Sequence, residues 1–479
     1  MFLKKQCIPC DDYEFDVQIA IDNSNRINSM RLLGLAYLYI VFNFVFLTMV
    51  SKHIENSIPM KIWTPFNMYS KFNFWMTYFY ESMVTILMMP VVIICEHNMN
   101  TAKFSFTILQ YSGVWRPKSL ISQWTILLYN FYSFLIVFLF LTLDGSVLLY
   151  IILVPTDVEE LMKNVMFFVT VFGLNLKVLY VLLRRNDIIE FDDMFLKKQC
   201  IPCDDYEFDV QIEIDNSNRI NSIRLLGLSY VYFVFNFVFL TLVSKNIENS
   251  MPMKIWTPYN MYSKFNFWMT YLHESSVMIV MMHVQIALDG LAIGMMQKIC
   301  GQLDIIKHRL YQINKLNDEN NNIDSQTQFI ILKKCLAHHS YVYLIGKKMN
   351  NLLGWMVILI FLITIIALCS VIYQISSANP NSVKFWSSVA STNTLLFEIF
   401  IFCWFGQKLI GKSAGIADAA YEINWTNLSI KSKRFLILII LRSAKPIELS
   451  GLSIVTMSLE TFLKILKVSY SSFNLIQSM

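Results

Sequence analysis

Residues 352–375 read LLGWMVILIFLITIIALCSVIYQI, a run without a single charged side chain. A helix of about 20 mostly apolar residues is long enough to cross the hydrocarbon core of a bilayer. The rest of the chain agrees with this stretch, because 55% of its 479 residues are hydrophobic and only 15% are charged. Soluble domains average about 25% charged residues. The sequence therefore predicts an all-α, polytopic membrane protein.

Working outward from this run, residues 99–479 contain seven apolar stretches of spanning length. They lie near 121–143, 163–184, 224–244, 267–296, 352–375, 384–408 and 452–476. The fourth stretch is longer than a bilayer requires, so we expect its helix to project into the cytoplasm. The sequence thus predicts seven transmembrane helices.

Lysine and arginine are concentrated in alternate loops. The loops after spans two, four and six are rich in them, whereas the loops after spans one, three and five hold few. Because loops rich in basic residues remain in the cytoplasm, we expect a cytoplasmic N-terminus and an extracellular C-terminus. Two sequons, at Asn424 and Asn427, fall in a predicted cytoplasmic loop and should carry no sugar.

The chain contains one long internal repeat. Residues 1–93 match residues 194–286 at a constant offset, and only 16 of the 93 positions differ. Repeats inside transporters have diverged because each half has its own contacts, so a repeat this close to identity indicates a recent duplication or a fusion of neighbouring genes. We expect residues 1–98 to be a partial copy with two extra spans, near 31–50 and 74–95, and residues 99–479 to be the seven-helix domain.

Nothing in the sequence favours an enzyme, a cofactor or a nucleic-acid partner. No nucleophile–base constellation and no phosphate-cradling glycine loop is visible, and the net charge of +5 is spread thinly. The CxxC pairs Cys7/Cys10 and Cys200/Cys203 are copies of one segment without a second ligand pair nearby. Cys335, His338 and His339 lie on a charged segment, so we expect surface or subunit-contact residues there, and no metal site.

Two charged residues fall inside predicted spans, where charges are costly. Lys177 lies about 10 Å from the predicted cytoplasmic end of its helix, so we expect its ammonium group to extend towards that end. Glu398 lies a similar distance from Lys408 and is a candidate partner for it.

Five segments, taken in order, resemble insect odorant receptors. Gly113-Val114-Trp115-Arg116-Pro117 is similar to the N-terminal signature of that family, and residues 252–258 are similar to its second outer loop. Around span six and its exit the matching positions are Cys403, Gly406, Leu409, Ser413, Ala420, Tyr421 and Trp425. The C-terminal matches are Lys445-Pro446, Phe462, Ile465-Leu466-Lys467, Tyr470-Ser471, Phe473 and Leu475. The resemblance covers residues 99–479, and residues 1–98 depart from it.

The resemblance implies a ligand-gated, non-selective cation channel subunit in the plasma membrane of olfactory neuron dendrites. It implies assembly with a shared co-receptor as a hetero-tetramer in the lipid bilayer, and a volatile odorant as ligand. The odorant would bind in the outer half of spans two to six. The seventh spans would line the pore, and the cytoplasmic ends of spans four to seven would form the subunit anchor.

The outer halves of these spans supply aromatic candidates for an apolar ligand pocket. These aromatic residues also suit helix packing and membrane interfaces. Asn236 adds a buried amide that would contact either another helix or the ligand. The candidate ligand-binding residues are Phe167, Phe168, Asn236, Phe237, Trp268, Tyr271 and Tyr373.

Polar side chains among apolar ones in span seven suit a wetted pore wall with an apolar constriction. Leu475 falls where the family motif would put that gate, although a lipid-facing role is equally open. The candidate pore residues are Thr456, Glu460, Ser471 and Leu475, and the candidate anchor residues are Asp289, Tyr421 and Trp425. The competing interpretations are a G-protein-coupled receptor, which the charge bias opposes, a transporter with repeated halves, and a non-functional fusion product.

Overall fold

The computed structural model describes residues 101–117, 123–217, 220, 253–259, 264–319, 325–379, 382–426, 428–452 and 454–478. In these ranges helices dominate, and the strands there are two of two residues each. The predicted all-α class is therefore confirmed. Predicted span three (224–244) and the copied spans of residues 1–98 lie outside the described residues. Residues 100–236, 252–257 and 281–479 form one compact unit, and residues 258–280 belong to another.

The first described helices are α3 (Thr101–Tyr111) and α4 (Gln123–Leu153), joined by the Gly-Val-Trp-Arg-Pro segment. Gly113 adopts φ = +75°, a left-handed conformation that glycine reaches without steric cost. The turn buries Trp115, and Tyr129 of α4 donates its hydroxyl proton to the carbonyls of Gln110 and Trp115 at 2.8 and 2.9 Å. The Arg185 guanidinium stacks over the Trp115 ring at 5.1 Å. This segment thus closes the start of α4 onto α3.

Helix α5 (Val158–Leu183) returns beside α4. Segment 253–257 lies over the turn between them, because the Trp256 amide donates to the carbonyl of Ser146 at 3.0 Å. Lys254 pairs with Glu160 at 2.8 Å, and Glu160 also accepts the hydroxyl proton of Tyr150 at 2.9 Å. The segment that resembles an outer loop is therefore fastened to this helical hairpin.

Beyond α5 the chain forms α6 (Arg185–Asp193), the short 3₁₀ helix η2 (Met194–Leu196) and a helical segment at 205–217. These elements lie where the sequence predicts a basic loop. These elements contact the long helices that follow.

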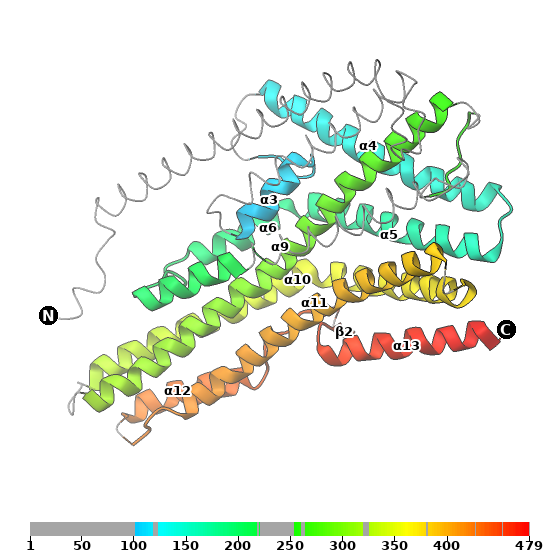
Figure 1. Cartoon of the computed structure of the whole chain (residues 1–479). Coiled ribbons are helices and arrows are strands. Elements are labelled where there is room, and N and C mark those ends of the chain that lie inside the picture. The colour runs from blue at the N-terminus through cyan, green and yellow to red at the C-terminus, as the bar shows by residue number, and fades with distance from the viewer. Residues whose placement is uncertain are drawn as a thin grey trace, which may run out of the picture. The chain divides into compact units, whose positions relative to one another are not determined.

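The long helices exceed the thickness of a bilayer. Helices α9 (Lys264–Glu319) and α10 (Ser325–Ser377) contain 56 and 53 residues, and α11 (Val383–Tyr421) contains 39. At 1.5 Å per residue, α9 is roughly 84 Å long, against about 30 Å for the hydrocarbon core. The expectation that span four continues beyond the membrane is thus met by its length, and span five continues likewise on its N-terminal side. In Figure 1, α10 runs beside α11 and reaches α12.

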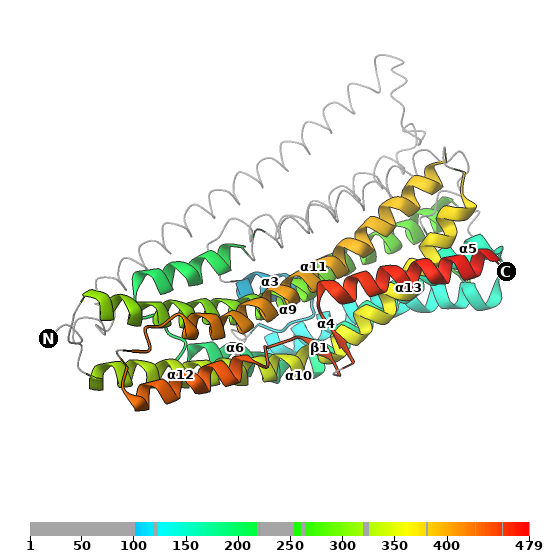
Figure 2. The ribbon, with the colours of Figure 1, turned by 90° about the horizontal axis from the view of Figure 1, so that it is seen from below.

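The C-terminal part differs from the predicted seventh span at 452–476. Helix α12 (Ile430–Ser443) is followed by the strands β1 (Ser450–Gly451) and β2 (Val455–Thr456), which pair antiparallel, and only then by α13 (Leu459–Ser478). The predicted start was wrong by seven residues because the apolar run includes this small hairpin. Figure 2 shows α13 running alongside α11 and α12 beside α10.

The hairpin rests on the long helices through small residues. A Cβ on Gly406 of α11 would lie 2.2 Å from the Met457 carbonyl oxygen, so only glycine permits this approach. Asn350 of α10 accepts the backbone proton of Ser450 at 2.7 Å. The segment between α12 and α13 is therefore held at α10 and α11 by backbone contacts.

Five described helices are long and apolar enough to cross a membrane: α4, α5, α9, α10 and α11. Their outward surfaces are apolar as well, with Trp124, Leu128 and Phe134 of α4 each more than 60% exposed. A soluble protein rarely exposes such a continuous apolar surface. These helices indicate a multi-pass membrane protein.

Candidate functional site

An apolar cluster lies between α5 and α10, and one predicted ligand residue packs against it. Met166 of α5 packs with Ala367 and Val371 of α10, and Phe167 packs against this cluster. Phe168 stacks on Phe172 along the same helix at 5.5 Å. The region thus has the apolar character that a volatile ligand requires.

Two of the other predicted ligand residues, Tyr271 and Tyr373, lie among the described side chains. Tyr373 is half-buried near the end of α10. Tyr271 is buried and stacks on Phe267 at 6.3 Å. Asn236, Phe237 and the side chain of Trp268 lie outside the described residues. Ligand contact stays a prediction for all seven residues.

A polar pair near this apolar cluster was missed by the sequence reasoning. Ser388 of α11 donates to the amide oxygen of Gln374 of α10 at 3.4 Å. The amide nitrogen of Gln374 is buried and has no hydrogen-bond partner among the described residues. A few polar groups in an apolar site fix the orientation of a ligand. The sequence signal that could have identified this pair is a glutamine three residues before the end of an apolar helix.

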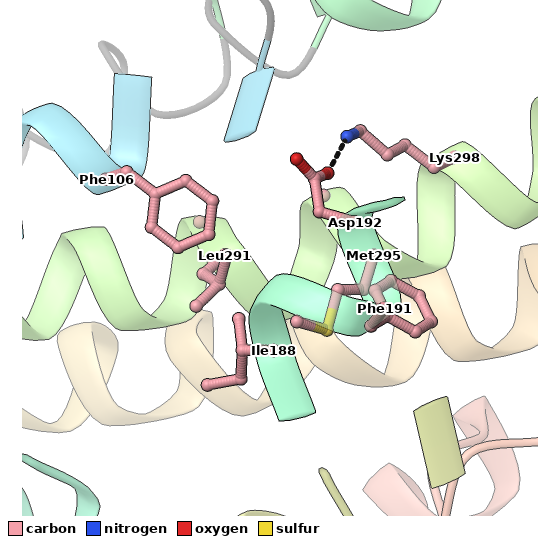
Figure 3. A pocket seen from close by; sticks show the side chains of 9 residues that line it. Phe106, Ile188, Phe191, Asp192, Leu291, Met295 and Lys298 are labelled. Carbon is pink, nitrogen blue, oxygen red and sulfur yellow. Dashed lines mark hydrogen bonds and ion pairs between the residues drawn. The ribbon is translucent and has the colours of Figure 1, made fainter. Parts of the chain in front are cut away.

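A small cavity lies between α3, α6 and α9 (Figure 3). Phe106, Ile188, Phe191, Leu291 and Met295 surround it, and the ion pair between Lys298 and Asp192, at 2.5 Å, borders it. Its volume of about 10 Å³ is enough for about one water molecule. An odorant does not fit there.

A cluster of charged residues joins three spans inside the apolar region. Lys177 of α5 lies 3.3 Å from Glu398 of α11 and 3.7 Å from Asp289 of α9. Gln285 of α9 donates to both Asp289 and Glu398, at 2.9 and 2.8 Å. We call Lys177, Gln285, Asp289 and Glu398 the membrane cluster. Buried charges in a membrane interior are usually paired in this way.

The membrane cluster corrects two expectations. Lys177 does not extend towards the end of its helix, since its side chain is only 4% exposed and is held by two carboxylates. Glu398 accepts from Lys177 and Gln285, where the sequence suggested Lys408. Pairing wins because a desolvated ammonium group gains more from two nearby carboxylates than from a partial approach to water.

A further buried carboxylate connects the first two described spans. Asn175 of α5 donates a short hydrogen bond to Asp144 of α4. Asp144 is 5% exposed, and its other carboxylate oxygen has no hydrogen-bond partner among the described residues. The sequence reasoning missed this pair, although a single aspartate within an apolar run of 31 residues was the signal.

A second cluster lies at the end of α9 that the sequence predicts to be cytoplasmic. Arg309 of α9 donates to both oxygens of Glu207, at 2.6 and 2.7 Å, and Glu207 is 1% exposed. His308 and Gln312 lie 3.0 and 2.8 Å from the same oxygen of Asp204. This two-point contact fastens the start of the helical segment 205–217 to α9.

The local sequence explains why this segment presents both carboxylates. Asp204 accepts the backbone proton of Glu207 at 2.8 Å, and Glu207 accepts the backbone proton of Cys203 at 2.7 Å. The two side chains thus satisfy two open N–H groups at the helix start, in the manner of a capping box, although the second bond goes to Cys203 and not to Asp204 itself. The same bonds lower the pKa of Asp204: burial opposes this, but the Glu207 amide, His308 and Gln312 favour the carboxylate.

His338 of α10 completes the arrangement. Because arginine only donates, the contact between Arg309 and His338 Nδ1 at 3.2 Å makes Nδ1 the acceptor. His338 Nε2 then donates to the amide oxygen of Gln302 at 2.9 Å, and Gln302 donates to the Cys200 carbonyl at 3.4 Å. We call Arg309, Glu207, Asp204, His308, Gln312, His338 and Gln302 the inner cluster.

The predicted surface position of Cys335, His338 and His339 is wrong. All three residues are 1% exposed or less, because α9 and α10 continue as packed helices beyond the apolar stretch. The Nε2 atom of His339 lies 3.4 Å from the Ser443 hydroxyl oxygen of α12, and its ring contacts the Tyr343 ring edge-on at 4.9 Å. Among the described residues no group of three or more metal ligands comes together.

The candidate pore residues fall on two different elements. Thr456 belongs to β2 and not to the span-seven helix, whereas Glu460, Ser471 and Leu475 lie on α13. Glu460 is exposed and pairs with Lys464 at 2.7 Å, and Ser471 is exposed as well. The side chain of Leu475 is not among those described.

The candidate anchor residues are dispersed. Tyr421, the last residue of α11, is 76% exposed, and the indole of Trp425 donates to its carbonyl at 3.1 Å. Asp289 lies instead in the membrane cluster. Contact with a neighbouring subunit stays a prediction for these three residues.

Comparison with known proteins places the chain in a family. Residues 157–470 match the model of the family described as 7tm Odorant receptor. The chain is 26% identical to a putative odorant receptor 92a of Drosophila melanogaster over 147 residues. The aligned stretch covers 31% of this chain and 36% of the relative. It is 31% identical to odorant receptor Or2 of Anopheles gambiae over 153 residues, and this stretch covers 32% of this chain and 40% of that relative. These matches span less than half of either relative.

Solved structures share the fold. The insect olfactory receptor OR5 from Machilis hrabei, in complex with eugenol, is 14% identical with a TM-score of 0.68, over 79% of this chain and 97% of that receptor. An odorant receptor coreceptor of Ooceraea biroi is 27% identical over 135 residues, 28% of each chain. The family model covers well over half of this chain, and the family comprises membrane receptors rather than enzymes. The chain belongs to the 7tm odorant receptor family.

Proposed function

We propose that this chain is an odorant receptor subunit that binds a volatile small molecule within its membrane helices and opens a non-selective cation channel. The match of residues 157–470 to the odorant receptor family carries the proposal. It is supported by the shared fold with a receptor that was solved with eugenol, a small aromatic compound.

The ligand site we propose lies where α5, α10 and α11 meet near Phe167. The cluster of Met166, Ala367 and Val371 supplies apolar contact surface, and Gln374 supplies a buried amide N–H group for a ligand oxygen. Phe168 and Tyr373, on α5 and α10, belong to the candidate set as well, and a ligand role for Asn236, Phe237, Trp268 and Tyr271 is a separate proposal from the sequence. An apolar site with one donor favours volatile alcohols, phenols, esters or ketones over hydrocarbons.

The channel would form with a co-receptor as a hetero-tetramer. The similarity to the odorant receptor coreceptor of Ooceraea biroi supports a common architecture for both subunit types. We propose α13 as the pore-lining helix, with Ser471 and Leu475 facing the conduction path, and Tyr421 and Trp425 in subunit contacts. Polar and apolar side chains alternate along α13, as a wetted pore with an apolar gate requires.

We propose residues 99–479 as the working receptor and residues 1–98 as an accessory or fused copy. Asp11 and Glu14 repeat Asp204 and Glu207, but the repeat ends at Ile93, before the positions that would correspond to Arg309 and His338. Two differences remove polar partners: Phe66 replaces Tyr259, whose hydroxyl bonds Thr270 at 2.8 Å, and Val92 replaces Gln285 of the membrane cluster. The copy therefore lacks partners that support the second copy.

The orientation we propose puts the inner cluster in the cytoplasm and the C-terminus outside the cell. The excess of lysine and arginine at the inner ends of α9, α10 and α11 supports it. The plasma membrane of an olfactory neuron dendrite is the corresponding location. A G-protein-coupled receptor would have the opposite orientation.

The test is to record current from cells that express residues 99–479 with a family co-receptor during exposure to a panel of volatile alcohols, phenols, esters and ketones. We expect a cation current that cells with the co-receptor alone do not give. Gln374→Leu removes the proposed hydrogen-bond donor. It should weaken responses to oxygenated odorants at unchanged surface expression. Surface-expressed receptor that responds to none of these compounds would contradict the proposal.

A further inference from the structure

A larger cavity of about 500 Å³ lies at the inner ends of the helices, between α9, α11 and the helical segment 205–217. Its volume lies within the roughly 300–1,000 Å³ typical of small-molecule sites. Three lysines line it: Lys307 of α9, and Lys408 and Lys412 of α11. The lining differs completely from the apolar cluster that we propose for the odorant.

The charges around this cavity do not cancel. Lys412 pairs closely with Asp304, so this lysine and this carboxylate neutralise each other. Lys307 and Lys408 have no ion-pair partner among the described residues, and Glu213 is the one further carboxylate in the lining. His308 is held by Asp204 and is covered by the Tyr206 ring at 4.2 Å. The cavity is therefore suited to an anion.

Gln297 of α9 shows that a ligand of this cavity should also carry a hydrogen-bond donor. Its side chain lines the cavity, and the residue is only 4% exposed. Its amide oxygen is buried and has no hydrogen-bond partner among the described residues. A buried acceptor without a donor costs about 1–3 kcal/mol of stability. A ligand that brings a hydroxyl or another donor to this point would remove that cost.

We propose that this cavity binds a phosphorylated polyol, with the phosphate at Lys307 and Lys408 and a hydroxyl group donating to Gln297. A phosphoinositide headgroup and a soluble inositol phosphate both have this chemistry. Val210 and Ile214, on the helical segment, give the cavity an apolar side for the glycerol end of a lipid. Lysine clusters at the cytoplasmic ends of spans attract anionic lipids for the same electrostatic reason.

The experiment uses the full chain in phosphatidylcholine nanodiscs. Calorimetric titration with inositol bisphosphate measures the soluble ligand, and native mass spectrometry measures retention of added phosphatidylinositol phosphate. We expect Lys307→Ala and Lys408→Ala each to weaken binding about fivefold, the effect of one lysine near an anionic headgroup. Gln297→Leu should weaken it about as much through the lost hydrogen bond.

Lys431→Ala is the matched control, because Lys431 is an exposed lysine on α12 that does not line the cavity. We expect no change in binding for this variant. Binding of the soluble probe identifies a free phosphorylated polyol, and retention of the lipid alone identifies a headgroup. The proposal is overturned if neither probe binds, if Lys431→Ala weakens binding as much as Lys408→Ala, or if Gln297→Leu binds like the unaltered chain.

Discussion

The membrane cluster and the inner cluster bury opposite charges in different ways. In the membrane cluster one ammonium group, Lys177, serves two carboxylates, and one of its two ion-pair distances is 3.7 Å. In the inner cluster the planar guanidinium of Arg309 fits both oxygens of Glu207 and reaches the carbonyls of Gln199 and Ile201, at 3.4 and 3.3 Å. The membrane cluster therefore has one positive and two negative groups. In the inner cluster nearly every N–H group of the Arg309 guanidinium has an acceptor.

The difference follows from the surroundings. Between apolar helices a point charge that reaches several partners suffices, because any pairing is favourable compared with an isolated charge in hydrocarbon. At the inner end of α9 the Glu207 carboxylate is 1% exposed, so both of its oxygens need a donor from the protein, and the fixed fork geometry of arginine supplies two. We therefore expect the membrane cluster to be sensitive to the loss of charge and the inner cluster to the loss of geometry.

The largest effect should come from Lys177→Met. The substitution leaves Asp289 and Glu398 without their cation, and removing one partner of a buried pair costs about 3–5 kcal/mol. The melting temperature of the detergent-solubilised receptor, followed by fluorescence-detected size exclusion, should fall accordingly. Adding Asp289→Asn and Glu398→Gln should restore much of the loss. A Lys177→Met receptor with unaltered melting temperature would show that Lys177 is not paired.

Arg309→Lys tests geometry without changing charge. Lysine cannot reproduce the two parallel bonds to Glu207, so we expect a loss of about 1–2 kcal/mol, and Arg309→Ala should cost about 2–3 kcal/mol. The same melting assay applies. Lys177→Arg is the matched comparison in the other cluster. If Arg309→Lys were harmless while Arg309→Ala were severe, charge alone would matter at the inner end.

The smallest effect should come from Asp204→Asn. Asparagine is as good as aspartate at a helix start, so the Glu207 amide keeps its acceptor. Only the contacts of the second Asp204 oxygen with His308 and Gln312 are lost, about 0.5–1 kcal/mol for partly exposed groups. Since the pKa of Asp204 is lowered in the folded protein, its carboxylate stabilises the fold above its unfolded pKa, and this stabilisation disappears as the pH falls through the folded value. Melting curves at decreasing pH should therefore lose less stability in Asp204→Asn than in the unaltered receptor.

The sequence predicted the helices well because apolar runs report membrane spans directly. Runs at 121–143, 163–184, 267–296, 352–375 and 384–408 all became helices. The start of span seven was wrong, since a hairpin of apolar residues and glycine cannot be distinguished by hydropathy from a helix end. That Gly406 lies beneath Met457 could not be known without the fold.

The partners of the charged residues in the two clusters could not be predicted from the sequence, for a different reason. Lys177 meets Asp289 and Glu398 from positions more than 100 residues away, and neither charge pattern nor periodicity encodes such a pairing. The burial of His338 was misjudged because charged neighbours on a helix suggested water, whereas helix α9 covers its other face through Gln302 and Arg309. Local composition predicts spans, and only packing decides partners.

Cys203 gives a direct test of the proposed cytoplasmic position of the inner cluster. Cys203 is exposed beside Arg309, while burial raises the pKa of the Cys200 thiol to about 11, so Cys200 stays protonated and unreactive at neutral pH. The measurement is labelling with a membrane-impermeant maleimide in cells that express the chain with serine at positions 7, 10 and 95, with Cys203→Ser as control. We expect label at Cys203 only after the cells are permeabilised. Label at Cys203 on intact cells would contradict the inverted topology.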